Sequence, residues 1–178
     1  HLHAAYALLL QRTYPSWLYP ITRGATTMWE RWDGIEPDGT FEDPSMNSFN
    51  HYAFGAVGDW MYRTIGGLDV DPAAPGYKHS LIAPRPGGGL TSARASIVTQ
   101  YGTLASAWRL EDSVFTLDVT VPPNTSSAVT LWGTTVDRVR DGGRPLAGDP
   151  GVHSVQQRGA DVVMEVGSGE YRFTIAKS

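Results

Sequence analysis

The stretch Val114-Phe-Thr-Leu-Asp-Val-Thr-Val121 decides the fold of the second half of the chain, because every other residue from Phe115 to Val121 is large and apolar. Successive side chains of a β-strand point to opposite faces, so this alternation is typical of a strand with one buried face. The same period recurs at Thr91 to Thr99, Val162 to Val166 and Tyr171 to Ile175. We therefore expect strands throughout this half.

Turn signals separate the expected strands at short intervals. They are Gly87-Gly88-Gly89, Glu111-Asp112-Ser113, Pro122-Pro123-Asn124, Asp141-Gly142-Gly143, Gly159 and Gly167-Ser168-Gly169. Short strands at such spacing predict an antiparallel β-sandwich, here of roughly eight or nine strands. We expect Trp108 and Trp132 to pack between the two sheets, since single aromatic residues on alternating strands commonly fill that space.

The first part of the chain has a helical pattern. Apolar residues at helical spacing predict a helix over residues 1–14, which Pro15 ends. A second helix is expected with Asn47 or Ser48 as its N-cap and Gly66-Gly67 at its end. Its apolar stripe is Ala53, Ala56, Val57, Trp60, Met61, Thr64 and Ile65. We place the boundary between a helical part, residues 1–76, and a β-sandwich domain, residues 77–178.

The helical part is expected to be incomplete. Two helices and a long loop cannot cover their own apolar stripe, and the helical pattern already runs at the first residue, which is not Met. We therefore interpret the chain as cut from a longer protein, whose other helices would cover the stripe. The β-sandwich, or a second copy of the chain in a homo-oligomer, is the alternative cover.

Composition limits the classes of function. The 178 residues carry a net charge of -4, which leaves no basic face for nucleic acid. No apolar run approaches the roughly 20 residues of a membrane helix, and the start does not have the pattern of a signal peptide. With no cysteine and no metal spacing among the histidines, we expect no metal and no cofactor. A calcium ion held by scattered loop oxygens is the open alternative, since such ligands leave no sequence signature. The compartment, cytoplasmic or secreted, stays open.

Residues 15–47 carry turn signals too dense for a regular element, so we expect a long irregular stretch there. A single glutamate in this stretch carries the strongest chemical signal. Glu30 lies between Trp29 and Trp32 in Gly24-Ala-Thr-Thr-Met-Trp-Glu-Arg-Trp-Asp33. A carboxylate beside indole faces is suited to hold a sugar and to act on it as an acid or a base, so a carbohydrate site is the first hypothesis. The alternatives are an ion pair between Glu30 and Arg31, a capping role for Glu30, and core packing of at least one tryptophan.

Four motifs in one order carry a family resemblance. They are Tyr14-Pro-Ser-Trp17, the segment around Glu30, Ser48-Phe-Asn-His-Tyr-Ala-Phe-Gly-Ala-Val-Gly-Asp-Trp60 and Pro75-Gly-Tyr-Lys-His79. Together they resemble the C-terminal part of bacterial α-L-rhamnosidases. The likeness continues through Pro84-Arg-Pro-Gly-Gly-Gly-Leu-Thr91, Tyr101-Gly102 and Val121-Pro-Pro-Asn-Thr125, and thins out beyond about Gly133. It implies the last helices of an (α/α)6 barrel followed by a β-sandwich.

The resemblance also implies an activity, the hydrolysis of glycosides with terminal α-linked L-rhamnose and inversion at the anomeric carbon. Carried over by motif, Glu30 is the general base and His51, in Asn50-His51-Tyr52-Ala53, contacts the sugar. Trp29 and Trp32 are candidate sugar walls, Trp32 the weaker one. The general acid would lie in the upstream barrel, so the isolated chain is expected to be inactive.

Three alternatives remain. An acid of the loop could supply the second carboxylate, with Asp33, Glu36, Asp38, Glu42 and Asp43 as candidates, although a solvated turn-rich surface is the more ordinary interpretation of these residues. The chain could be a non-catalytic carbohydrate-binding or structural module that acts through its β domain. It could also belong to another helical-barrel glycosidase with a different sugar.

Overall fold

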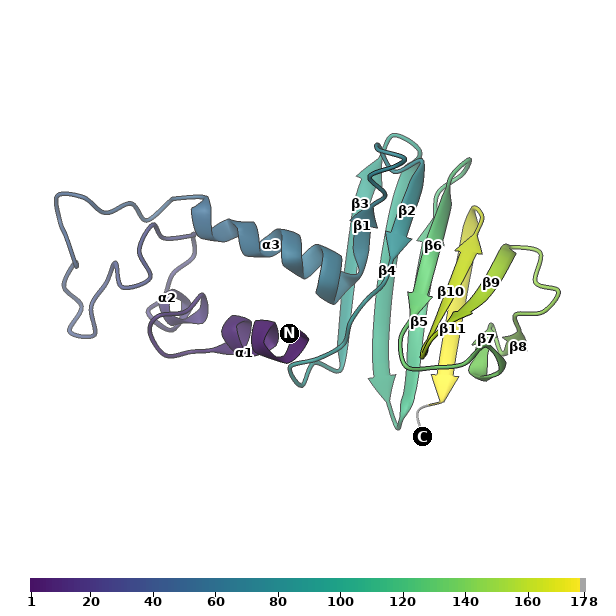
Figure 1. Ribbon diagram of the computed structural model, residues 1–178. Coiled ribbons are helices and arrows are strands. Elements are labelled where there is room, and N and C mark those ends of the chain that lie inside the picture. The colour runs from purple at the N-terminus through teal and green to yellow at the C-terminus, as the bar shows by residue number, and fades with distance from the viewer. Residues whose placement is uncertain (177–178) are drawn as a thin grey trace. The chain divides into compact units, whose positions relative to one another are not determined.

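The computed structural model describes residues 1–176, and the chain divides into two compact units (Figure 1). The helical unit consists of residues 1–59 together with residues 87–89. The β unit consists of residues 60–86 and the chain from Leu90 onward. Helices therefore come first and strands follow, which confirms the two-part α+β class.

The helical unit contains little regular structure. Its helices are α1 (Leu2–Leu10), α2 (Leu18–Thr22), the 3-10 helix η1 (Ala53–Ala56) and the first residues of α3 (Val57–Trp60). The ring of buried Tyr6 on α1 packs closely against the backbone of Gly87 and Gly88. A Cβ added at either glycine would lie only 2.5 or 2.6 Å from that ring, so glycine is needed for this contact. Most of residues 23–52 is irregular, in keeping with the turn signals of residues 15–47, although the short helix α2 lies within that stretch.

The expected second helix begins later than its sequence suggests. It starts with η1 at Ala53 and continues through α3 into η2 (Met61–Gly66), which has π-helical hydrogen bonding. The N-cap expected at Asn47 or Ser48 is wrong, because the main-chain N–H and C=O of Ser48 both bond to Glu30. The expected end is confirmed: Gly67 is left-handed, with φ of 76°.

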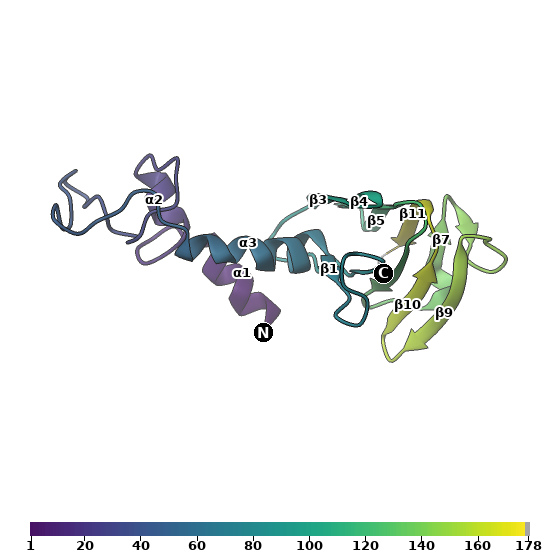
Figure 2. The same ribbon diagram turned by 90° about the horizontal axis from the view of Figure 1, so that it is seen from above.

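The β unit contains two sheets, which Figure 2 shows as separate layers. The first has the order β1 (Leu68–Val70), β2 (His79–Ile82), β6 (Ser126–Leu131), β10 (Asp161–Val166) and β9 (Val152–Arg158). The second has the order β3 (Ser92–Thr99), β4 (Gly102–Glu111), β5 (Val114–Val121), β11 (Gly169–Ala176), β7 (Val139–Asp141) and β8 (Arg144–Pro145). A 3-10 turn, η3 (Val136–Arg138), precedes β7. Neighbouring strands are antiparallel except β2 and β6, which are parallel.

Alternating side chains from both sheets form the core of the β unit. Leu117 and Phe173 are register partners in one sheet, Val129 and Met164 are partners in the other, and all four are fully buried. This confirms the sandwich that the alternation predicts. Residues 77–176 contain ten strands rather than eight or nine, because β7 and β8 are only three and two residues long and too short to alternate. β1 lies before residue 77, where no strand was expected.

The two tryptophans expected in the core differ. Trp108 is 1% exposed and its Nε1–H donates to the carbonyl of Ile65 at 2.7 Å, so its expectation is confirmed. Trp132 is 37% exposed, and core packing is wrong for it. It follows the last residue of β6, where alternation no longer fixes the facing of a side chain. The Arg85 guanidinium lies 4.0 Å from the centre of its ring.

The two units bury very different amounts of apolar surface. In residues 1–59, Tyr6 and Trp29 are the buried large hydrophobic side chains, whereas most strands of the β unit contribute such a residue. Large apolar side chains that the helical unit leaves exposed are Leu8, Leu10, Tyr14, Ile21, Phe41, Met46 and Tyr52. Burial of apolar surface is the main favourable contribution to folding, so the β unit has the means to fold alone and the helical unit has little.

This asymmetry predicts unequal protection of the two units when the chain is isolated. Amide protons of β4, β5, β10 and β11 should exchange at least 100-fold more slowly than those of residues 18–56, because opening the β unit exposes a full core. Hydrogen exchange followed by mass spectrometry, with size determined in parallel, measures this. Equal protection of both units in a monomer would contradict the expectation.

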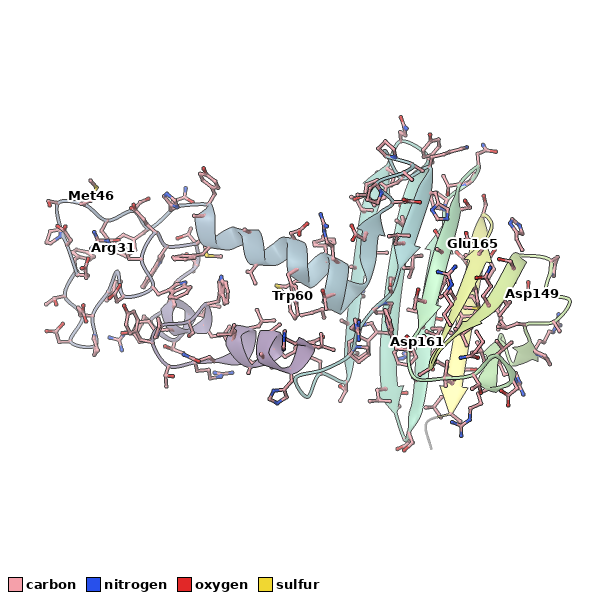
Figure 3. The ribbon with its side chains drawn as sticks, in the orientation of Figure 1. Arg31, Met46, Trp60, Asp149, Asp161 and Glu165 are labelled. Carbon is pink, nitrogen blue, oxygen red and sulfur yellow. The ribbon has the colours of Figure 1, made fainter. Side chains whose placement is uncertain are left out.

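One ionisable cluster links three parts of the first sheet. His79 on β2 contacts Asp71 through Nδ1 at 2.8 Å and Glu165 on β10 through Nε2 at 3.0 Å (Figure 3 labels Glu165). Partial burial disfavours the charged ring, but the hydrogen bonds with Glu165 and Asp71 outweigh it and raise the pKa of His79. Hydrogen bonds from Ala73 and from His79 lower the pKa of Asp71. The imidazolium therefore joins the β1–β2 connection to β10.

Replacing His79 should change stability in a pH-dependent way. A raised pKa in the folded state means that the contribution of the ring is complete below its unfolded value, about 6.5, and is lost as pH rises through the folded value. The His79→Gln variant should therefore lose more free energy of unfolding at pH 6 than at pH 9, measured by urea denaturation. His153→Gln, an exposed histidine of the same unit, is the matched control. An equal loss at both pH values would contradict this account.

Candidate active site

Two irregular segments of the helical unit pair side by side. The N–H of Glu30 donates to the carbonyl of Ser48 at 2.8 Å, and the N–H of His51 donates to the carbonyl of Met28 at 2.8 Å. The Thr27 hydroxyl donates to the carbonyl of Phe49 between them. This antiparallel pairing brings the segment of Glu30 beside the segment of His51, although the two residues are far apart in the sequence.

The Glu30 carboxylate is held by one oxygen. Its Oε2 accepts a hydrogen bond from the main-chain N–H of Ser48 at 3.0 Å, while Oε1 has no hydrogen-bond partner within residues 1–176. The ion pair between Glu30 and Arg31 is not formed, because Arg31 pairs with Glu42 instead. Glu30 thus keeps one free oxygen on a half-buried, oriented carboxylate.

Sequence reasoning named Ser48 only as a cap and missed its contact with Glu30. The donor is a main-chain N–H, which every residue except proline carries, so no residue type at position 48 signals the contact.

His51 has a defined tautomer. Its Nδ1 accepts a hydrogen bond from the N–H of Ala53 at 3.2 Å, which places the proton of the neutral ring on Nε2. The ring stacks on Tyr52 with centroids 5.4 Å apart and an interplanar angle of 6°. Tyr52 is itself 88% exposed. His51 therefore presents an N–H donor, fixed by the start of η1.

The two tryptophans that flank Glu30 lie in different surroundings. Trp29 is 4% exposed and packs edge-on against Phe49, with centroids 5.1 Å apart. Trp32 stacks on Phe54 at 4.4 Å and meets Trp17 edge-on at 5.6 Å. Its buried Nε1–H has no acceptor among the described residues. Both tryptophans thus have structural partners, and their roles as sugar walls stay predictions.

Three acids of the loop have local partners. Oδ1 of Asp38 accepts from the hydroxyl and the N–H of Thr40, and these hydrogen bonds lower the pKa of Asp38. Asp43 is held in the same way by Ser45, which lowers the pKa of Asp43. Glu42 pairs with Arg31 (Figure 3 labels Arg31). These contacts favour the interpretation of a turn-rich surface for this part of the loop.

The β unit has an acidic hollow of about 450 Å³ away from these segments in the sequence. Its charged lining residues are Asp118, Asp141, Arg144, Asp149, Glu170 and Arg172. Burial and the neighbouring Asp149 raise the pKa of Asp141, while Arg172 pairs with Asp118 at 2.6 Å. Within residues 1–176 no three acidic, histidine or cysteine side chains are grouped as a metal site.

No helix in the described part of the chain combines the length and the apolar character that a membrane crossing requires.

Comparison with known proteins assigns both parts of the chain. Residues 1–65 match the family of bacterial alpha-L-rhamnosidase 6 hairpin glycosidase domains, and residues 67–144 match the bacterial alpha-L-rhamnosidase C-terminal domain. The chain belongs to the bacterial α-L-rhamnosidases. The family resemblance and the fold that it implies, barrel helices followed by a β-sandwich, are thereby confirmed.

Named relatives agree with this membership. The α-L-rhamnosidase of Streptomyces avermitilis is 48% identical over 98% of the chain, and one from Formosa agariphila is 48% identical over 71%. A crystal structure of the Streptomyces avermitilis enzyme complexed with L-rhamnose matches 98% of the chain with a TM-score of 0.86 and 47% identity. The enzyme from Aspergillus terreus matches 96% with a TM-score of 0.75 and 36% identity.

The chain spans only a small share of these relatives, 16% of the Streptomyces avermitilis protein and 13% of the Formosa agariphila protein. The likeness to the Streptomyces avermitilis protein covers 177 residues, so it continues well past Gly133, where the motifs alone thin out. The domain boundary expected between residues 76 and 77 stays a prediction.

Proposed function

We propose that this chain supplies the general base and one sugar contact of an inverting α-L-rhamnosidase. The observation that carries the proposal is the pairing of residues 27–30 with residues 48–51, which brings the segments of Glu30 and His51 together. The solved relative holds L-rhamnose, which supports a rhamnosyl group as the substrate. The substrate class is glycosides with a terminal α-linked L-rhamnose.

Glu30 acts on the water that attacks the sugar. Its free Oε1 takes a proton as the water oxygen bonds to the anomeric carbon, and the bond from that carbon to the leaving oxygen breaks on the opposite face. The leaving oxygen receives a proton from a second carboxyl group, which an inverting enzyme places about 6.5–9.5 Å from the first. We assign that acid to the part of the enzyme upstream of this chain.

His51 orients the sugar rather than transferring a proton. With Nδ1 occupied by the N–H of Ala53, its Nε2–H is the available donor and suits a rhamnose hydroxyl. Trp32 is half-buried and stacks on Phe54, so part of its indole stays available as a sugar wall, whereas Trp29 is buried against Phe49 and contributes chiefly to the order of the segment.

A non-catalytic carbohydrate-binding module is the alternative, and exposed Trp132 is the one observation that favours it. Arg85 already lies over the Trp132 ring, and Trp108 is enclosed in the core. Titration of the chain with L-rhamnose distinguishes the two. Binding that Trp132→Ala abolishes and Glu30→Gln leaves intact would support the module.

The Glu30→Gln variant tests the general base in a full-length α-L-rhamnosidase that carries this chain. An amide cannot accept the proton of water, so kcat for an aryl α-L-rhamnoside should fall about 10²- to 10⁴-fold with KM changed little. Glu42→Gln, which removes a neighbouring carboxylate of the same loop, should leave kcat within about threefold. Normal turnover by Glu30→Gln would refute the role of Glu30.

The isolated 178-residue chain should not turn over, because it holds the base without the general acid. Hydrolysis of an aryl α-L-rhamnoside should stay within about tenfold of the buffer background, against the full-length enzyme as the positive control. Robust hydrolysis by the purified chain would show that both carboxyl groups lie within it.

A further inference from the structure

We propose that the main-chain N–H of Ser48 is a positioning group for the reaction. It holds Oε2 of Glu30, so that Oε1 is the oxygen that accepts the proton of the water. This inference rests on the proposed role of Glu30 as the general base.

The geometry around Glu30 and Ser48 is reciprocal. The N–H of Glu30 donates to the carbonyl of Ser48 at 2.8 Å, and the N–H of Ser48 donates to Oε2 of Glu30 at 3.0 Å. In a regular antiparallel pair the second bond would go to a main-chain carbonyl. Here the carboxylate takes its place, so the side chain of Glu30 is fixed relative to its own backbone.

Neighbouring contacts hold Ser48 on both sides. Before it, the side-chain amide of Asn47 donates to the carbonyl of Gly34 at 3.1 Å. After it, Phe49 packs edge-on against buried Trp29, the residue that precedes Glu30. A Cβ at Gly34 would lie 3.1 Å from the Phe49 ring and 3.2 Å from the Asn47 amide, so glycine permits this close packing. Anchors therefore flank both partners of the hydrogen bond.

A neutral amide donor gives the two carboxylate oxygens different tasks. The Ser48 N–H cannot release its proton, so it occupies Oε2 without competing in the transfer. Oε1 then remains as the acceptor in a fixed direction. Without this donor the carboxylate would rotate more freely about the Cγ–Cδ bond, because the energy minimum of that torsion is broad. Oε1 would then point at the water for a smaller fraction of the time.

The experiment removes the hydrogen and keeps the backbone. In the full-length enzyme, residue 48 is replaced by alanine in one variant and by lactate, the α-hydroxy acid with the same side chain, in the other. The two variants then differ in one group: the main-chain N–H of residue 48 is an ester oxygen in the second. Ser48→Ala keeps the N–H and loses only the hydroxyl that accepts from the N–H of Asn50 at 3.3 Å, so it is the reference against which the ester is measured. Replacing its N–H by the ester oxygen should lower kcat about 10- to 100-fold with KM within twofold, as expected for a lost donor to a charged group.

A second background separates positioning from general damage. In Glu30→Ala there is no carboxylate to orient, so the ester should change the rate by less than about twofold. This should hold both for the residual reaction with water and for the reaction in which added azide attacks the anomeric carbon. Equal losses with and without Glu30 would overturn the proposal, and so would an ester without effect while Glu30→Gln is inactive. Full turnover by Glu30→Gln would instead refute the general base itself.

Discussion

The pairing of residues 27–30 with residues 48–51 is the constraint on which the site depends. The helical unit has little regular structure around these residues and buries few apolar side chains, so helix packing does not place Glu30. Main-chain hydrogen bonds to Ser48 and Met28, with the buried contact between Trp29 and Phe49, do so instead. A loop can carry a well-oriented carboxylate when its backbone groups pair with each other in this way.

The two units differ in how they bury their apolar side chains. The β unit alternates its apolar residues across two sheets and fills the space between them, as Leu117 with Phe173 and Val129 with Met164 illustrate. The helical unit leaves such residues as Ile21, Phe41 and Met46 exposed (Figure 3 labels Met46). This is the pattern expected of a unit whose apolar surface is covered by helices of a larger domain, and the match of residues 1–65 to a six-hairpin domain is consistent with it.

Features that a periodic pattern controls could be predicted from the sequence, whereas features that depend on a single contact could not. Alternation predicted the sandwich and the burial of Trp108, and the motifs predicted the family. The N-cap expected at Asn47 or Ser48 and the burial expected for Trp132 were wrong, because each depends on one local feature: the hydrogen bonds between Ser48 and Glu30, and the end of β6 before Trp132. The pairing of Arg31 with Glu42 instead of Glu30 is of the same kind, since residue types alone do not choose between two nearby carboxylates.

We propose that the Glu30 carboxylate faces the water that attacks the rhamnosyl group, with Oε2 already held by the N–H of Ser48. The most direct measurement is a crystal structure of a full-length enzyme that carries this chain, bound to L-rhamnose. If this proposal is right, Oε2 should stay on the N–H of Ser48, and a water or the anomeric hydroxyl should lie about 2.6–3.2 Å from Oε1. A Glu30 carboxylate turned away from the anomeric carbon, with another carboxylate in that place, would contradict it.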